Sequence, residues 1–335
     1  MSRAADAKPL AGASGALVVS LDFELAWGVR DIFSLDGPYR ANLLGAREAV
    51  PRILDLLAEY GVAATWATVG FLFAESREEL EHYSPNLRPR YASKHFDPYA
   101  DALGGGEADD PLRYAPSLIA QIAATPRQEI ASHTFSHYYC LEAGQSAEEF
   151  AADLASAVAI AKAHGHVLKS LVFPRNQLRA DYLPLLARTG FTAFRGTESN
   201  FLNRPRPGAS GSTVVRGLRA ADVFVNLTGS GAVPWSAVKP LGGVINVPSS
   251  RFLRPWQPNG SLEALRWRRV ASSMEAAAMG GALFHLWWHP HNFGVNLEQN
   301  LHALRRHLEL YARLRDKHGF SSYSMAEVAE LVRPS

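Results

Sequence analysis

The stretch "ALVVSLDF", residues 16–23, is short, apolar and rich in β-branched residues, as expected of a buried β-strand. The segment "AREAVPRILDLLAEYG" (46–61) follows and has the pattern of a helix, with Pro51 near its first turns and Gly61 at its end. A second apolar run, "VAATWATVGFLF" (62–73), has the pattern of another buried strand. A strand, a helix and a strand in this order predict a βαβ unit with parallel strands.

The same alternation continues to the end of the chain. Further strands are expected at 128–132, 166–174, 190–196, 242–250 and 282–290. Further helices are expected after Ser76, which begins a capping box with Glu79, at 146–165 with a capping box of Ser146 and Glu149, and at 180–189, 261–279 and 297–318. About seven βα units indicate an α/β fold and favour a (β/α) barrel over an open sheet.

Length alone would fit about two domains, but (β/α) barrels reach this size as one unit. Two segments rich in Pro, Gly and Asn, 82–116 and 197–240, interrupt the alternation and are expected to be long loop insertions. We therefore expect a flexible N-terminus at 1–15 and a single domain at 16–335.

The composition excludes several classes of protein. With 335 residues, 47% hydrophobic and 20% charged, the chain can bury a large core, and disorder is excluded. The 34 basic and 32 acidic residues are mostly interspersed, so no nucleic acid is expected as a partner. Cys140 is the single cysteine, so any metal site must use histidines and carboxylates. No signal peptide and no membrane span are recognisable, and a cytoplasmic location is expected.

Polar residues collect where the predicted strands end, although a buried apolar strand does not need them in order to fold. They are Asp22 and Glu24 after the first strand, His133 and His137 after the third, Arg175 and Asn176 after the fourth, and His289 and His291 after the strand at 282–290. The carboxyl ends of the strands form the face of a (β/α) barrel that carries its chemistry. Carboxylates and imidazoles gathered there are the parts of a mononuclear hydrolytic metal site.

The two histidines of "EIASHTFSHYYC" (129–140) are four residues apart. Positions i and i+4 of a helical turn share a face, so His133 and His137 could reach one metal ion. A chain with 12 histidines also produces such pairs by chance, so a metal site requires a third ligand.

Several segments resemble the polysaccharide deacetylase family, carbohydrate esterases of the chitooligosaccharide-deacetylase type that remove acetyl groups from N-acetylated sugars. They are "SLDFELAWG", "ATWATVG", "SHTFSH", "FPRNQ" and "HLWWHPHNFG", in the family's order and spacing. The resemblance covers residues 16–325 and implies a distorted (β/α) barrel of about seven strands, in agreement with the strand count.

The resemblance also implies a role for the matching residues. His133 and His137 match the metal-binding pair, and Asp22 matches the catalytic base that activates water. Many members have two adjacent aspartates where this chain has Asp22, Phe23 and Glu24. We place the third metal ligand at Glu24, because a glutamate is also a hard oxygen donor. The exchanged assignment, with Asp22 as the ligand, stays open.

Arg175 resembles the family's arginine that holds the carboxylate of the base, although "PRNQ" departs from the usual R-x-P-x-G pattern. His289 matches the histidine that protonates the leaving amine. For His285, on the same face of the strand, we expect a structural role in the core. Candidate substrate contacts at the same rim are Trp27, Asn176, Trp287, His291 and Asn292. Loop hydrogen bonding is an equal alternative for Asn176, His291 and Asn292.

Arginines and tryptophans crowd the segments "RFLRPW" (251–256) and "RWRR" (266–269). We expect a solvated helix face at 266–269. If part of the cluster lies near the barrel mouth, arginine could bind a phosphate or carboxylate of the substrate while tryptophan stacks on a sugar or base. The expected partner is thus an N-acylated sugar linked to a nucleotide or to a lipid pyrophosphate.

The sequence therefore predicts a metal-dependent hydrolase, with Zn²⁺ as the expected ion, that removes an acetyl or similar small acyl group from an N-acylated sugar. Two histidines and a carboxylate leave coordination positions open for water and substrate. Cytoplasmic glycan or sugar-conjugate biosynthesis is the expected setting. Two alternatives stay open: a related amidohydrolase acting on a small non-sugar amide or cyclic ureide, and an inactive metal- or carbohydrate-binding protein.

Overall fold

The computed structural model describes residues 14–198 and 221–333 of the chain. The flexible N-terminus predicted at 1–15 therefore lies almost wholly outside the described residues. The same holds for the middle of the insertion predicted at 197–240.

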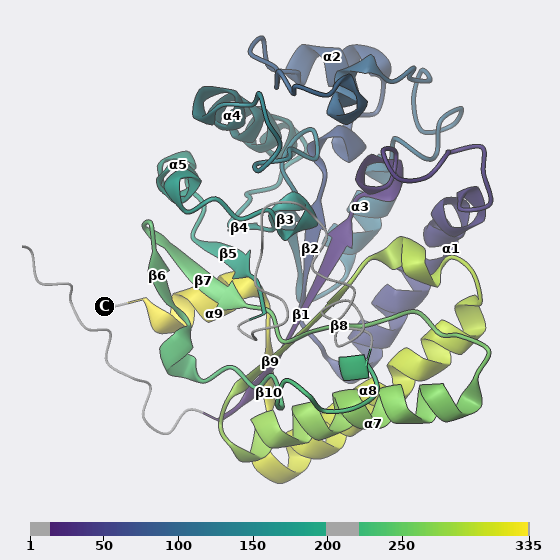
Figure 1. The fold of residues 1–335 in the computed structure, drawn as a ribbon, viewed down its shortest axis with the longest axis vertical. Coiled ribbons are helices and arrows are strands. Elements are labelled where there is room, and N and C mark those ends of the chain that lie inside the picture. The colour runs from purple at the N-terminus through teal and green to yellow at the C-terminus, as the bar shows by residue number, and fades with distance from the viewer. Residues whose placement is uncertain (1–13, 199–220, 334–335) are drawn as a thin grey trace, which may run out of the picture.

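A curled, mostly parallel sheet forms the centre of a single α/β domain (Figure 1). Its parallel strands follow the spatial order β7-β5-β4-β3-β2-β1-β9-β8. Their bounds are β1 (Ala16–Phe23), β2 (Ala64–Thr68), β3 (Gln128–Ser132), β4 (Ser170–Leu171), β5 (Ala193–Gly196), β7 (Val244–Pro248), β8 (Arg251–Phe252) and β9 (Leu283–Trp288). β10 (Ser321–Tyr323) pairs in parallel with the start of β1, and β6 (Lys239–Leu241) pairs antiparallel with β7.

The segment 244–252 brings the two ends of the curled sheet together. Its first half, β7, pairs with β5, whereas its second half, β8, pairs with β9. Between them the Ser249 amide donates to Gly196 O, and the Ser250 amide donates to His285 O. The sheet therefore forms an incompletely closed barrel, as predicted.

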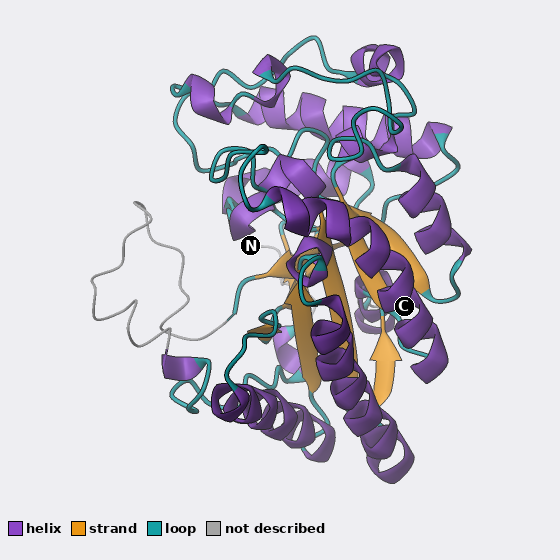
Figure 2. Ribbon diagram, turned by 90° about the vertical axis from the view of Figure 1, so that its right-hand side faces the viewer, coloured by secondary structure: helices purple, strands orange, loops and turns teal. Residues whose placement is uncertain are grey.

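Helices lie on the outside of the curled sheet, around the strands (Figure 2). Their bounds are α1 (Arg40–Tyr60), α2 (Arg77–Tyr83), α3 (Pro116–Ala124), α4 (Ala147–Ala163), α5 (Leu183–Thr189), α7 (Gly260–Met279), α8 (Leu297–His318) and α9 (Met325–Val332). α7 and α8 run side by side along one edge of the molecule (Figure 1). Every residue of β1 is buried, as expected of a central strand covered on both faces.

Some element bounds differ from the prediction. α1 begins at Arg40 rather than at 46, so Pro51 lies inside the helix; Gly61 ends it in the left-handed conformation, as predicted. β2 ends at Thr68, and a 3₁₀ turn (Gly70–Phe73) replaces the predicted second half of the strand. The cause is a tertiary contact, because the amides of Gly70 and Phe71 donate to Thr134 O and Phe135 O of the loop after β3.

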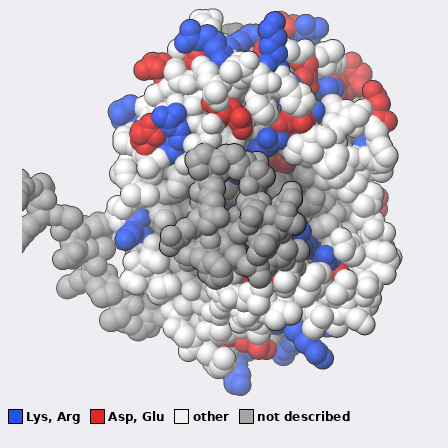
Figure 3. All heavy atoms as spheres, in the orientation of Figure 1, with Lys and Arg blue, Asp and Glu red and all other residues white. Residues whose placement is uncertain are grey.

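Two surface properties follow the composition. Basic and acidic side chains are interspersed on the face shown in Figure 3, mostly over its upper part, where α2 and α4 lie in Figure 1. Within 14–198 and 221–333, no helix is both long and apolar enough to cross a membrane.

Candidate active site

Two carboxylates lie at the carboxyl end of β1, the central strand. Asp22 belongs to the strand, and Glu24 follows it directly. Residues i and i+2 of a strand share a face, so both side chains point to the same side of the sheet. The backbone at Gly28 makes room for the second one, because a Cβ there would lie 1.9 Å from Glu24 Cδ. Both carboxylates are buried at the rim of the barrel.

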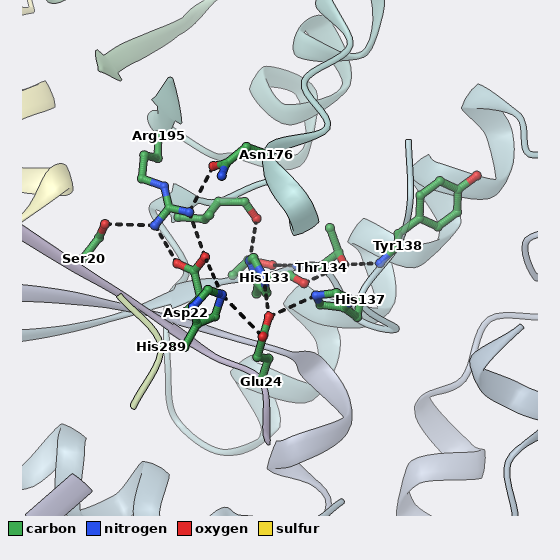
Figure 4. A network of polar contacts seen from close by, with 12 residues as sticks. Ser20, Asp22, Glu24, His133, Thr134, His137, Tyr138, Asn176, Arg195 and His289 are labelled. Atoms are coloured by element: carbon green, nitrogen blue, oxygen red, sulfur yellow. Dashed lines mark hydrogen bonds and ion pairs between the residues drawn. The ribbon is translucent and has the colours of Figure 1, made fainter. Parts of the chain in front are cut away.

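Asp22 is held by Arg195, the buried arginine of β5. Arg195 Nη1 and Nη2 donate to Asp22 Oδ1 and Oδ2 at 2.5 and 2.8 Å (Figure 4). The guanidinium also donates to Ser20 Oγ and Asn176 Oδ1, both at 3.1 Å, and stacks 4.2 Å from the centre of the Trp287 ring. Burial alone would raise the pKa of Asp22, but Arg195 outweighs it and lowers the pKa below the ordinary 3.8. Asp22 is therefore an ionised, rigidly placed carboxylate.

The structure differs from the sequence prediction at Arg175, which does not reach Asp22. Arg175 has a left-handed backbone (φ 53°) in the turn after β4, so its side chain leads away from the first strand. Its guanidinium pairs with Asp31 and lies 4.6 Å from the centre of the Tyr139 ring. The sequence did contain a signal for the actual partner, since Arg195 is the charged residue at the end of the predicted strand 190–196.

Glu24 faces the two histidines of the "SHTFSH" segment. Glu24 Oε2 lies 3.2 Å from His133 Nε2 and 3.1 Å from His137 Nε2 (Figure 4). The three side chains are buried, and one potential ligand atom from each lies within 4.8 Å of the others. Burial would raise the pKa of Glu24, but the neighbouring imidazoles of His289, His133 and His137 hold it well below 4.5.

The donor chemistry of this cluster fits a metal ion. His133 Nδ1 lies 2.9 Å from Val172 O, which can only accept a hydrogen bond, so Nδ1 carries the proton of the neutral ring. The lone pair of His133 Nε2 therefore points at the Glu24 carboxylate, an arrangement that a shared cation stabilises. Burial lowers the pKa of His137, which keeps its ring neutral as a metal ligand requires.

The loop that presents the two histidines is not the helical turn that the spacing suggested. Thr134 and His137 have left-handed φ angles of 63° and 57°, and the segment forms bends rather than a helix. Asp153 of α4 holds the loop, because its carboxylate accepts the amides of Phe135 and Ser136 at 2.7 and 3.1 Å. Burial raises the pKa of Asp153 to about 6, although these donors oppose the shift. Asp153, an acidic residue among the buried positions of α4, was not among the site residues predicted from the sequence.

His289 lies at the end of β9, next to both carboxylates. Its Nε2 is 3.7 Å from Asp22 Oδ2 and 3.5 Å from Glu24 Oε1, and its side chain is 23% exposed. Asn292 Nδ2 lies 3.4 Å from His289 Nδ1, and Asn292 Oδ1 accepts a hydrogen bond from Tyr39 at 3.2 Å. The Tyr39 hydroxyl thus orients the Asn292 amide with its N–H groups toward Nδ1. In the neutral ring this leaves the proton on Nε2, the atom that faces the site.

The other two histidines of this segment are buried, and neither Nε2 has a carboxylate partner in the described part of the chain. His285 Nε2 lies 2.8 Å from Ser20 Oγ, and its Nδ1 lies 3.2 Å from Pro248 O. Burial and the nearby Arg195 lower the pKa of His285 to about 3, so it is a neutral core residue. Burial and the neighbouring His289 likewise lower the pKa of His291 to about 3; the two rings stack at 5.1 Å.

The predicted substrate contacts occupy different environments. Trp27 is buried and donates to Arg113 O, so it is a core residue rather than a substrate contact. Buried His291 offers little surface to a substrate. Trp287 and Asn176 both contact Arg195, and Asn292 contacts His289. These three half-buried side chains remain candidates for contact with a substrate.

Residues 36–194 match the family model for polysaccharide deacetylase. This segment of the chain resembles the polysaccharide deacetylase family. The matched region contains His133 and His137, whereas Asp22, Glu24 and His289 lie outside it. No curated protein matches the chain.

Solved structures with related folds include two proteins described as polysaccharide deacetylases. One, from Mycobacterium smegmatis, is 16% identical, with a TM-score of 0.55 over 96% of this chain and 92% of the other. The second, from Pseudomonas aeruginosa PAO1, is 12% identical, with a TM-score of 0.52 over 94% and 89%. An allantoinase is 14% identical, with a TM-score of 0.51 over 94% and 88%. At these identities the likeness is one of fold.

The candidate site brings together three chemical groups. Glu24, His133 and His137 could hold a metal ion, Asp22 is an ionised carboxylate, and His289 presents a ring nitrogen. A ligand set, a proton acceptor and a proton donor within one buried rim are what hydrolysis of an unactivated amide requires.

Proposed function

We propose that the protein is a metal-dependent hydrolase that removes an acetyl or similar small acyl group from the amide nitrogen of an N-acylated sugar. The observation that carries the proposal is the buried Glu24, His133 and His137 cluster, with Asp22 and His289 at its edge. The match of residues 36–194 to the polysaccharide deacetylase family model supports de-N-acetylation of a carbohydrate.

Glu24, His133 and His137 would hold the metal ion. A divalent ion held there would polarise the amide carbonyl and lower the pKa of water, and two nitrogens with one carboxylate oxygen suit Zn²⁺. The Val172 carbonyl supports this function by fixing the proton of His133 on Nδ1.

Asp22 and His289 would move the protons. Asp22 accepts the proton of the attacking water, because its oxygens retain lone pairs beyond the two bonds from Arg195. His289 in its protonated form would donate from Nε2, the ring nitrogen that faces both carboxylates, to the nitrogen of the leaving amine, and would return to the neutral ring. Partial exposure of His289 leaves room for a substrate above it. The products are a carboxylic acid, acetate for an acetyl group, and an amino sugar.

The metal-loaded protein should be assayed with N-acetylated hexosamines and with allantoin, in parallel with a His137→Ala variant and a His318→Ala control. We expect release of acetate from an N-acetylated sugar, lost on metal removal and in His137→Ala but kept in His318→Ala. Opening of the allantoin ring without sugar turnover would instead favour an amidohydrolase of cyclic ureides. Stable metal binding without turnover of any amide would favour a binding protein. The cytoplasmic setting remains a prediction.

A further inference from the structure

A cavity lies beside the candidate active site, between α7, α8 and the segment after β8. Its volume is about 340 Å³, which is sufficient for a small polar group and its neighbours. We call it the arginine pocket. Its lining includes Arg251, Arg254, Arg266, Arg306, Trp256 and Trp267. The helix at 266–269 is therefore not simply the solvated face that the sequence suggested, because only Arg268 of its three arginines is highly exposed.

The charges lining the arginine pocket are not balanced within it. Its two glutamates are each engaged, Glu263 by Arg266 at 2.6 Å and Glu298 by Arg52 at 3.0 Å. Arg251 forms a long ion pair with Asp222, at 3.4 Å, and the same carboxylate also pairs with Arg269. The pocket therefore has an excess of positive charge.

Arg254 is an exposed residue of the pocket lining. Glu198 partly offsets the charge of its guanidinium. Partial burial and the neighbouring Arg266 lower the pKa of Arg254. An anion in the pocket would relieve this repulsion.

Several buried polar atoms of the lining also lack a partner in the described part of the chain. They are Arg251 Nε, Arg266 Nε, Trp267 Nε1 and His307 Nδ1. His307 is only 4% exposed, and buried polar groups are rarely left without a hydrogen bond. Arg306 lies 4.5 Å from the centre of the Trp267 ring and can turn toward a ligand from the exposed side of α8.

The arginine pocket adjoins the candidate active site through one aromatic ring. Phe252 lines the pocket, and its ring centre lies 5.7 Å from that of His289 and 4.7 Å from that of Trp287. This proximity follows from the topology, because β8 pairs with β9 in a register that sets Phe252 opposite Trp287. A substrate whose leaving amine lies at His289 would extend past Phe252 into the pocket.

We infer that the arginine pocket binds an anionic group, phosphate or carboxylate, that the substrate carries next to its acylated amino sugar. This inference rests on the proposed function and specifies its substrate class. Arginines recognise such groups through paired N–H donors, and Trp256 and Trp267 supply apolar contact beside them. The binding energy gained there would lower KM, because the group is remote from the bond that breaks.

The first experiment compares three N-acetylated sugars: a neutral one, its phosphate ester and a uronic acid. We expect kcat/KM to be at least tenfold higher for one or both anionic sugars, mainly through KM. Arg254→Gln and Arg306→Gln should remove most of this preference. Arg268→Gln is the matched control, because it lies on α7 but does not line the pocket. Equal kcat/KM for all three sugars, unchanged in Arg254→Gln, would overturn the inference and leave the proposed function intact.

The second experiment separates the pocket from catalysis. Calorimetry on the Asp22→Asn protein measures the binding of the sugar phosphate and of inorganic phosphate, without turnover. We expect binding that weakens at least tenfold in Asp22→Asn/Arg254→Gln and recovers partly in Asp22→Asn/Arg254→Lys, which restores the charge. Such binding in a protein that hydrolyses no amide would refute the proposed function but keep the anion site. Binding of equal strength in Arg254→Gln and Arg254→Lys would refute the site.

Discussion

Asp22 and Glu24 lie two residues apart on one face of the first strand, yet their carboxylates have opposite kinds of partner. Arg195 gives Asp22 a permanent positive charge at 2.5 Å. Glu24 instead faces the imidazoles of His133 and His137 at 3.2 and 3.1 Å, and an imidazole, unlike a guanidinium, carries no permanent charge. The side chains that surround each carboxylate, rather than the residue type, therefore set its role.

The difference has a chemical consequence. Asp22 is satisfied by protein groups alone and needs no ion to remain charged. Glu24 and the nitrogen lone pairs that face it form a site which is completed by a cation. This is the structural argument for Glu24 as the metal ligand and Asp22 as the base, and it favours that assignment over the exchanged one.

The largest effect, on the free energy of unfolding, is expected when Arg195, the partner of Asp22, is replaced. Arg195→Met leaves Asp22 buried without its counter-ion, and such losses lower the free energy of unfolding by about 3–5 kcal/mol. Urea denaturation measures the change. The control is Arg52→Met at the exposed pair with Glu298, where less than about 1 kcal/mol is expected. Similar values for the two variants would show that Asp22 does not depend on Arg195.

The next largest effect concerns His289, which lies between the two carboxylates. His289→Gln should lower kcat for an amide about a hundredfold, because general acid catalysis typically contributes at least that factor. Metal content should be unchanged, and an activated ester should be less affected, since its leaving group needs little protonation. Normal amide turnover in His289→Gln, together with loss of turnover in a folded, metal-loaded His291→Gln, would place the acid elsewhere.

A smaller effect is expected in acid, measured on metal-free protein. The folded pKa of Asp22 is below its ordinary value of 3.8, so its ionised form stabilises the fold. This contribution is fully present above about pH 4 and is lost as the pH falls through the folded pKa, at about 1.4 kcal/mol for each unit of pKa difference. Asp22→Asn should flatten the pH dependence of the unfolding free energy below pH 4. An unchanged slope would contradict the Asp22–Arg195 pairing.

The smallest effect is expected from Tyr39→Phe, which removes the hydroxyl that orients Asn292 toward His289. A hydrogen bond of this kind contributes about 1 kcal/mol, so kcat should fall about fivefold with unchanged metal content. Tyr60→Phe, which removes a hydroxyl that contacts Arg305, is the control and should not change kcat. A change in metal content in Tyr39→Phe would indicate a role at Glu24 instead.

Much of the fold could be predicted because buried parallel strands are continuous apolar runs and the helices carry local end signals. The predicted strand at 16–23, the strand at 128–132 and the helix at 297–318 have the predicted bounds. Ser146 and Glu149 form the predicted capping box. By contrast, β2 is cut short by contacts with a loop that is distant in the sequence, and such contacts leave no local signal.

The candidate site likewise contains residues with a local sequence signal and residues whose contacts are distant in the sequence. Residues at strand ends, such as Glu24, His133 and His137, could be found from the barrel rule and the motif spacing. The pairing of Asp22 with Arg195 was harder to find, because three strands (β4, β3 and β2) separate β5 from β1 in the sheet, and only the curling of the sheet brings Arg195 across the interior. Asp153 acts from a helix, where a buried acidic residue does not reveal which loop it holds.

We assign Glu24 as the metal ligand and Asp22 as the base. The most direct test is the metal content of Asp22→Asn and Glu24→Gln, measured by elemental analysis alongside amide turnover and compared with the unmodified protein. We predict about one divalent ion per chain and no turnover in Asp22→Asn, and a large loss of bound metal in Glu24→Gln. Loss of metal in Asp22→Asn, with full retention in Glu24→Gln, would contradict the assignment and exchange the two roles.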